Sequence, residues 1–182
     1  STLLSVFMPP WAKLGTVEEY LKRLRDPHSY KKICEHVKKQ EERIETWKKI
    51  RVSSVLKEEN KRFIGKTIHE AAREVGKEPS HFIVDLLYEE EDQVEMINFS
   101  LNEDNFKQII LHPLVVVASD GWALAPYGIL GNGKPHPRSY GTFPRMLGKY
   151  VREEKIMTLG EAIQKMTSIT AKKFGLKWRG FL

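Results

Sequence analysis

The chain has 182 residues, of which 41% are hydrophobic, and a formal net charge of +6 from 30 Lys and Arg against 24 Asp and Glu. This length allows one ordinary domain with a hydrophobic core. No apolar run approaches the length of a membrane-spanning helix, the first residues lack the pattern of a signal peptide, and the single Cys excludes an intrachain disulfide, so we expect a cytoplasmic protein.

The positive charge does not predict nucleic-acid binding. Basic and acidic residues are mixed within segments such as KKQEERIETWKK and VREEKI, and no RRM, KH or zinc-finger pattern is present. A solvated, ion-paired surface explains the composition better. We therefore expect neither nucleic acid nor membrane as a partner.

The first half of the chain is predicted to be mostly helical. Apolar residues recur at helical spacing, and the helix starts carry typical N-cap residues, including a Thr followed by Glu three positions later. Shorter apolar segments with β-branched residues predict strands. The predicted elements are helices that begin at Thr16, His28, Thr67 and Pro79, and strands at residues 50–55 and 94–99.

The second half begins with a helix capped by Asn102 and ended by His112-Pro113. The apolar run Leu114–Ala118 follows, and it is typical of a strand buried on both faces. Because a helix separates this run from residues 94–99, the two strands are expected to be parallel with a right-handed crossover. Two further helices are predicted, with caps at Thr158 and Ser168.

Cys34 and two histidines are weak candidates for chemistry. Cys34 lies on an apolar helix stripe, and a metal ligand or nucleophile is one interpretation. No His or second Cys lies near it at ligand spacing, so a buried, unreactive thiol is favoured. His69 and His81 lie beside apolar stripes and need no ligand role.

The segment from Leu111 to Tyr150 carries the candidate site. Ser119-Asp120-Gly121 follows the apolar run, and α/β barrels place their chemistry at the C-terminal ends of such strands. A loop rich in Gly and Pro then leads to His136-Pro137-Arg138. The alternative for Asp120 is an ordinary turn or cap residue.

Three strings in this part of the chain, SDG, GKPHPRSYGTFPRMLGKYVREE and LGEAIQKMTS, closely resemble the C-terminal part of the D-aminoacylases. These N-acyl-D-amino-acid deacylases are zinc enzymes of the amidohydrolase superfamily. The resemblance implies an α/β fold: the C-terminal part of a TIM barrel, mostly helical, with about two parallel barrel strands and a helical insertion. Residues 1–92 would form the insertion or lid and the return to the barrel, and residues 93–182 the last barrel strands and helices of a single incomplete domain.

The resemblance also implies roles for individual residues. Asp120 matches the metal-site carboxylate that acts as catalytic acid and base, and Arg138 matches the residue that holds the substrate α-carboxylate. His136 either lines the pocket or shapes the loop. Ser1 matches the tail of a Ser-rich segment near the substrate, with a frayed terminus as the alternative.

Most zinc ligands of the family have no match here. The family binds zinc through a His-x-His, a bridging Cys or carboxylate and two further histidines, whereas the six histidines of this chain stand alone. Asp120 could serve as a metal ligand only if another chain supplies the others. We expect no zinc and no activity in this chain alone, and a partner that carries the N-terminal barrel half, or a homo-oligomer. Whether Ser1 arises by Met removal or processing stays open.

The leading hypothesis is the C-terminal portion of a zinc-dependent D-aminoacylase, which hydrolyses the linear amide C–N bond of small N-acyl-D-amino acids to a carboxylate and a D-amino acid. One alternative is a catalytically inactive truncated fragment that folds as a helical oligomer. Another is a binding module that keeps the carboxylate pocket of Arg138 without the metal.

Overall fold

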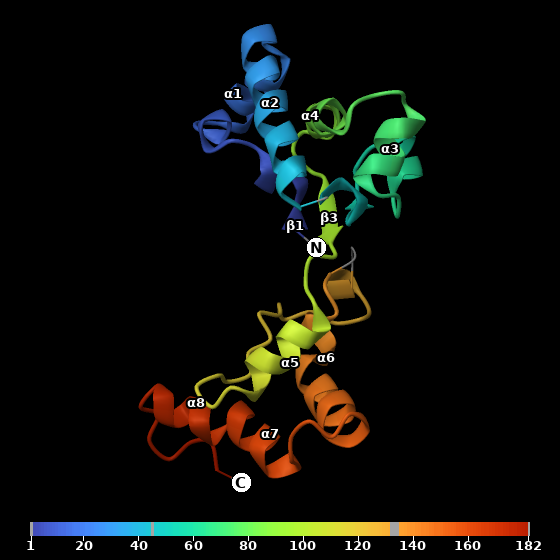
Figure 1. The fold of residues 1–182 in the computed structure, drawn as a ribbon. Coiled ribbons are helices and arrows are strands. Elements are labelled where there is room, and N and C mark those ends of the chain that lie inside the picture. Colours follow the sequence, from blue (N-terminus) through green and yellow to red (C-terminus); the bar gives the residue numbers. More distant parts are fainter. Residues whose placement is uncertain (1, 45, 132–134, 182) are drawn as a thin grey trace. The chain divides into compact units, whose positions relative to one another are not determined.

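The computed structural model describes residues 2–44, 46–131 and 135–181. It divides into two compact units, Ser1–Ser100 and Leu101–Leu182, each with its own hydrophobic core (Figure 1). The described residues are mostly helical, as the sequence predicted, and they also form a small antiparallel sheet. No helix among the described residues is both long and apolar enough to cross a membrane.

The sheet of the first unit has three antiparallel strands in the order β1-β3-β2. The strands predicted at residues 50–55 and 94–99 are confirmed as β2 and β3. β3 lies in the middle, between β1 and β2, and Met96 pairs with Thr2 on one side and Val52 on the other. The strands are β1 (Thr2–Leu3), β2 (Ile50–Ser54) and β3 (Glu95–Asn98).

Helices form the rest of the first unit (Figure 1). The predicted caps are confirmed, because Thr16 and Thr67 each accept a hydrogen bond from the backbone N–H three residues later and complete a capping box. The helices are α1 (Val17–Arg25), α2 (Pro27–Ile44), α3 (Ile68–Glu74) and α4 (Pro79–Glu89). Short turns of 3₁₀ helix connect them: η1 (Leu4–Phe7), η2 (Pro10–Lys13), η3 (Thr46–Lys48) and η4 (Glu58–Phe63).

The core of the first unit contains the predicted stripe of α2. Ile33 and Val37 are fully buried, and Cys34 is a buried free thiol. Burial raises the pKa of Cys34 to about 11. The predicted burial of this cysteine is confirmed, and a raised pKa favours the protonated thiol, in line with the prediction of an unreactive side chain.

The second unit consists of helices and irregular segments. α5 (Glu103–Leu111) begins at the predicted cap Asn102, and α7 (Leu159–Met166) begins at Thr158, which forms the predicted capping box with Glu161. α6 (Arg138–Arg145) continues into η6 (Met146–Glu153), which is a π-helix, and η5 (Ile129–Gly131) is a short turn. The last helix, α8 (Ser168–Lys173), starts at the predicted place, but its cap position is Thr167, and no side chain caps it.

The prediction of a barrel strand at Leu114–Ala118 is wrong for this structure. The second unit contains no strand among residues 101–131 and 135–181, and β3 pairs only with antiparallel neighbours, so no parallel pair or right-handed crossover forms there. A strand needs a neighbouring backbone to satisfy its N–H and C=O groups. Here lysine side chains instead bind two carbonyls of this run, those of Leu114 and Val115.

A buried carboxylate links the end of α4 to the segment after β2. Glu90 is 1% exposed and accepts hydrogen bonds from the backbone N–H groups of Leu56 and Lys57 and from Nδ2 of Asn60, the last at 2.6 Å. Removing the carboxylate would leave the two backbone donors without this acceptor, and Asn60 with only its 3.3 Å contact to Oε2 of Glu89, which is costly.

We predict that Glu90→Ala lowers the free energy of unfolding of the first unit by about 2–3 kcal/mol, because buried donors lose a charged acceptor. Urea denaturation followed through the NMR amide signals of α4 would measure it. Glu59→Ala, which removes an exposed carboxylate nearby, is the control and should change stability by less than about 0.5 kcal/mol. Equal effects of the two substitutions would show that the Glu90 contacts do not stabilise the unit.

Candidate active-site segment

Asp120 lies where the chain turns after the apolar run. Its backbone has φ 49°, in the left-handed region that Asp tolerates better than most residues. The hydroxyl of Ser119 accepts a hydrogen bond from the N–H of Gly121 at 3.1 Å and closes the turn. The Ser-Asp-Gly sequence thus forms a tight turn that presents the Asp120 side chain to solvent, with an exposed fraction of 83%.

Gly121 allows two distant segments to meet. A Cβ atom at this position would lie 2.9 Å from Cα of Ser139 and 3.1 Å from the carbonyl oxygen of Arg138. The next residue adds a hydrogen bond, because the N–H of Trp122 donates to Oγ of Ser139 at 3.3 Å. Only glycine permits this close approach of backbones.

This approach brings Asp120 and Arg138 together. Oδ2 of Asp120 lies 3.0 Å from Nη2 of Arg138, the first residue of α6. Both side chains are exposed, so the ion pair itself contributes at most about 1 kcal/mol to stability. The ion pair shows instead that a carboxylate and a guanidinium 18 positions apart in the sequence lie next to each other in the structure.

His136 lies beside this pair through the backbone. Its Nδ1 accepts a hydrogen bond from the N–H of Arg138 at 3.0 Å. Partial desolvation of the ring, together with the positive charge of Arg138, lowers the pKa of His136 below its ordinary value. A lowered pKa favours the neutral imidazole, whose Nδ1 can accept this hydrogen bond when the proton lies on Nε2, and the contact agrees with a role in shaping the loop. The fourth predicted residue, Ser1, lies outside the described residues.

The residues around Asp120 do not by themselves fit a zinc ion. Catalytic zinc needs about three protein ligands. In the described part of the chain no group of three or more His, Cys, Asp or Glu side chains could hold a metal ion. Asp120 can supply one ligand at most, and the remaining ones would have to come from outside the described residues.

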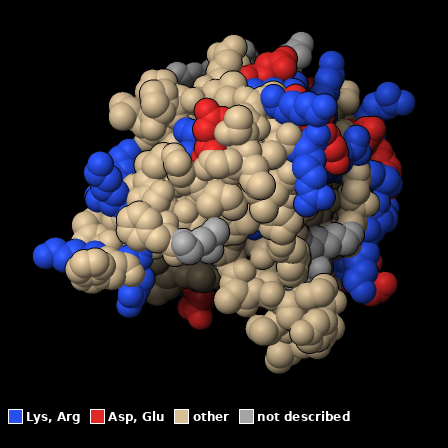
Figure 2. Space-filling view, turned by 90° about the horizontal axis from the view of Figure 1, so that it is seen from below, with Lys and Arg blue, Asp and Glu red and all other residues tan. Residues whose placement is uncertain are grey.

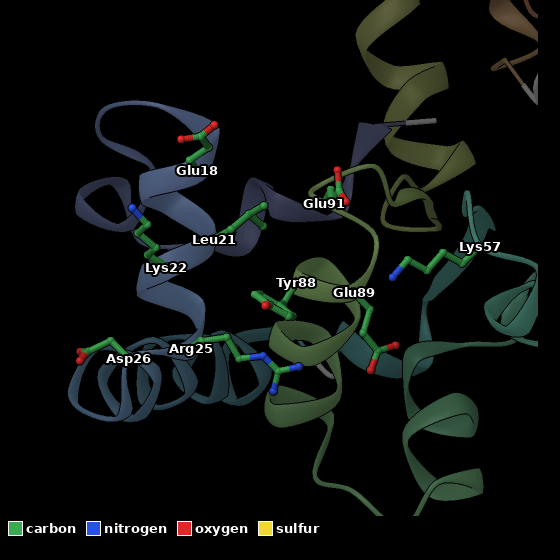
Figure 3. A pocket seen from close by; sticks show the side chains of 9 residues that line it. All are labelled: Glu18, Leu21, Lys22, Arg25, Asp26, Lys57, Tyr88, Glu89 and Glu91. Atoms are coloured by element: carbon green, nitrogen blue, oxygen red, sulfur yellow. The ribbon is translucent and has the colours of Figure 1, made fainter.

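A separate pocket of 660 Å³ lies in the first unit (Figure 3). Arg25 of α1 extends along Tyr88 of α4, with its guanidinium 4.0 Å from the ring centroid. Acidic and basic side chains are mixed in its lining, which therefore favours no single ligand charge. The lining residues are Glu18, Leu21, Lys22, Arg25, Asp26, Lys57, Tyr88, Glu89 and Glu91.

Charges of both signs also mix on the surface. Figure 2 shows one face on which Lys and Arg occur beside Asp and Glu, around a broad uncharged area. Several large apolar side chains of the second unit are exposed. They include Leu101, Trp122, Tyr127, Ile129, Trp178 and Phe181.

Comparison with known proteins identifies the relatives of the chain. It is 41% identical over 86 residues to an N-acyl-D-glutamate deacylase and 35% identical over 118 residues to a D-aminoacylase, both from Alcaligenes xylosoxydans xylosoxydans. Among solved structures, the N-acyl-D-glutamate deacylase of Bordetella bronchiseptica, complexed with zinc and a phosphonate inhibitor, matches 76% of the chain with a TM-score of 0.58 and 34% identity. The chain is homologous to one portion of the D-aminoacylases. No protein-family model matches it.

The chain is much shorter than its D-aminoacylase relatives. The matches cover 47% and 65% of this chain but only 16% and 22% of the two curated relatives. The match to the solved Bordetella deacylase covers 26% of that protein. A second solved structure is a D-aminoacylase described as defining a novel subset of amidohydrolases. The match to it covers 72% of this chain and 25% of that enzyme, with a TM-score of 0.55 and 32% identity. The predicted resemblance to a portion of these enzymes is confirmed, whereas the arrangement of a TIM barrel is not.

Two residues near the site were not singled out from the sequence. Ser139 accepts the N–H of Trp122, and Lys165 binds two carbonyls of the segment that leads to Asp120. Lys165 lies three residues after the buried Ala162, at the edge of the apolar face of its helix. A lysine at such a position signals a buried cation that needs partners.

We predict that Gly121→Ala lowers the free energy of unfolding of the second unit by about 1–3 kcal/mol, because the new methyl group overlaps backbone atoms that cannot move independently. NMR-detected urea denaturation of the α5–α8 signals is the measurement. Gly141→Ala in α6 is the matched control, because outside its own helix backbone no atom lies within 4 Å of the position that a Cβ would take, and it should raise stability by up to about 1 kcal/mol. A neutral Gly121→Ala would contradict the packing argument.

Proposed function

We propose that this chain supplies part of the active site of a zinc-dependent D-aminoacylase, a hydrolase that acts on linear amide bonds. The observation that supports the proposal most directly is the ion pair between Asp120 and Arg138 in a chain homologous to the D-aminoacylases. In this proposal the rest of the barrel, and with it the remaining zinc ligands, comes from another segment or another chain. The protein would work in the cytoplasm, where a single unpaired thiol is stable.

Asp120 would act as the proton carrier. Amide hydrolysis requires that water lose a proton as its oxygen adds to the carbonyl carbon, and that the nitrogen gain a proton as the C–N bond breaks. One carboxylate can do both by accepting the first proton and donating it to the leaving amine. The side chain of Asp120 is 83% exposed in this chain, so it is free to contact a substrate.

Arg138 would bind the α-carboxylate that every N-acyl amino acid carries. Within the described residues its guanidinium makes one ion pair, through Nη2 to Asp120, so its other N–H groups, including the second one of Nη2, are available to a second carboxylate. The planar guanidinium binds carboxylates with two parallel hydrogen bonds. Because Arg138 would bind both Asp120 and the substrate carboxylate, it would hold the substrate within reach of Asp120. His136 would orient the backbone of Arg138.

The exposed apolar side chains of the second unit support a partner. Trp122, Tyr127 and Ile129 follow Asp120 directly and are 76–86% exposed. Surfaces of this kind mark contacts with another protein segment. The competing function, an inactive fragment that assembles into a helical oligomer, would use the same surface.

We predict that the native species purified from its source is a zinc-containing assembly or polypeptide larger than the 21.1 kDa chain. Native mass spectrometry and metal analysis on one sample would measure both properties, and removal of zinc by a chelator should abolish hydrolysis of N-acyl-D-amino acids. A metal-free homo-oligomer of the chain would favour the inactive fragment and overturn the enzyme proposal.

We predict different kinetic defects for the two site residues in the complete enzyme. Asp120→Asn should lower kcat by about 10²–10⁴-fold, because it removes the proton acceptor. Arg138→Ala should instead raise KM by about tenfold or more, because the substrate loses a charged hydrogen-bond partner. Steady-state kinetics with an N-acyl-D-amino acid and its C-terminal amide would separate the two roles.

The controls are Asp104→Asn and Arg152→Ala, which change exposed charges elsewhere in the second unit. Both should leave kcat and KM within about twofold of the native values, since exposed surface charges contribute little. The amide substrate should be insensitive to Arg138→Ala. If Arg138→Ala raised KM equally for both substrates, the carboxylate-binding role would be excluded.

A further inference from the structure

Lys165 holds the segment that leads to Asp120. The side chain is 7% exposed, and its Nζ donates hydrogen bonds to the carbonyl oxygens of His112 at 2.8 Å and Val115 at 2.9 Å. Its own carbonyl oxygen accepts from the N–H of Val117 at 3.3 Å. One residue thus contacts the segment at three points.

The geometry of the turn explains why one ammonium group reaches two carbonyls. The N–H of Val115 donates to the carbonyl oxygen of His112 at 3.0 Å, so the chain forms a turn after α5. Lys173 of α8 adds a hydrogen bond from its Nζ to the carbonyl oxygen of Leu114 at 2.7 Å. Three of four consecutive carbonyl groups are therefore bound by lysine side chains.

Burial of an ammonium group is costly, so its contacts must be specific. Lys165 lies on the face of α7 that also carries the buried Ala162, next to the buried Val117. An apolar side chain would satisfy such a position without the cost of desolvating a charge. Lysine is useful here because its three donors can fix backbone carbonyls that have no neighbouring strand.

The same segment is fixed again just after Asp120. Gly121 packs against the backbone of Ser139, and the N–H of Trp122 donates to Oγ of Ser139. Asp120 lies between these two anchors, three residues after Val117 and one before Gly121. Loss of the two Nζ contacts would weaken the first anchor, which would then rest on the backbone bond to Val117 and on Lys173.

We propose that Lys165 is a positioning residue, which sets the geometry of Asp120 relative to Arg138 by fixing the backbone of residues 112–117. Its Nζ is engaged with carbonyl groups, so it acts through the backbone and does not contact the substrate. The catalytic consequence rests on the proposed function, whereas the effect on the backbone does not.

The test uses hydrogen–deuterium exchange on the full chain. Lys165→Met, which keeps the length of the side chain but removes its donors, should speed exchange of peptides that cover residues 113–122 by about tenfold. Lys165→Arg, which keeps donors, should restore exchange to within about threefold of the native chain. Lys172→Met, which removes an exposed lysine of α8, is the control and should change nothing.

Peptides from α1–α4 report whether an effect is local and should be unchanged in every variant. If Lys165→Met unfolds α5–α8 as a whole, Lys165→Gln replaces it, because its shorter amide has fewer donors for the two carbonyls. The same increase in the exchange of residues 113–122 relative to the native chain is then required. Native-like exchange at residues 113–122 in the folded variant would overturn the proposal.

In the complete enzyme, Lys165→Met should lower kcat at least tenfold and change KM less than about threefold, because Arg138 still binds the substrate. Lys165→Arg should recover most of kcat. Faster exchange with an unchanged kcat would overturn the positioning role. If the complete assembly with native Lys165 has no deacylase activity, the proposed function fails, and exchange at residues 113–122 alone then decides whether Lys165 fixes this backbone.

Discussion

The candidate site depends on a close approach between two backbone segments. Gly121 lies against Arg138 and Ser139, at a distance that no residue with a Cβ atom could adopt without displacement. The approach determines where α6 begins relative to the turn, and it brings the guanidinium of Arg138 within 3.0 Å of Asp120. An exposed ion pair is too weak to create this arrangement, so the pairing of charges follows from the packing of the backbones.

The two units satisfy their backbone groups in different ways. In the first unit β3 is paired on both edges, and the buried Glu90 binds N–H groups of the segment that follows β2. In the second unit the described residues contain no sheet, and lysine ammonium groups instead bind two carbonyls of the apolar run. A carboxylate accepts hydrogen bonds, so the buried Glu90 binds backbone N–H groups in the first unit. An ammonium group donates them, so the buried Lys165 binds backbone carbonyl groups in the second.

Local features of the sequence predicted the local structure. Thr16, Thr67 and Thr158 form capping boxes because the interaction needs only residues three positions apart. The run Leu114–Ala118 failed as a predicted strand, since β structure requires a neighbouring strand that the pattern of one segment cannot supply. The family resemblance assigned Asp120 and Arg138 to one active site, but the ion pair between them was not predicted, because 17 residues separate them and no spacing rule joins them.

The incomplete site and the exposed apolar surface have one physical explanation. A carboxylate and a guanidinium are present, but the described residues hold no cluster that could bind a metal ion. The side chains that follow Asp120, from Trp122 to Ile129, are exposed although their aromatic and aliphatic groups favour burial. The relatives are about three times as long, so a further segment could both cover this surface and bring ligands to Asp120. In that arrangement hydrophobic burial would drive the association, and the anchored backbone around Asp120 would place its carboxylate before the partner arrives.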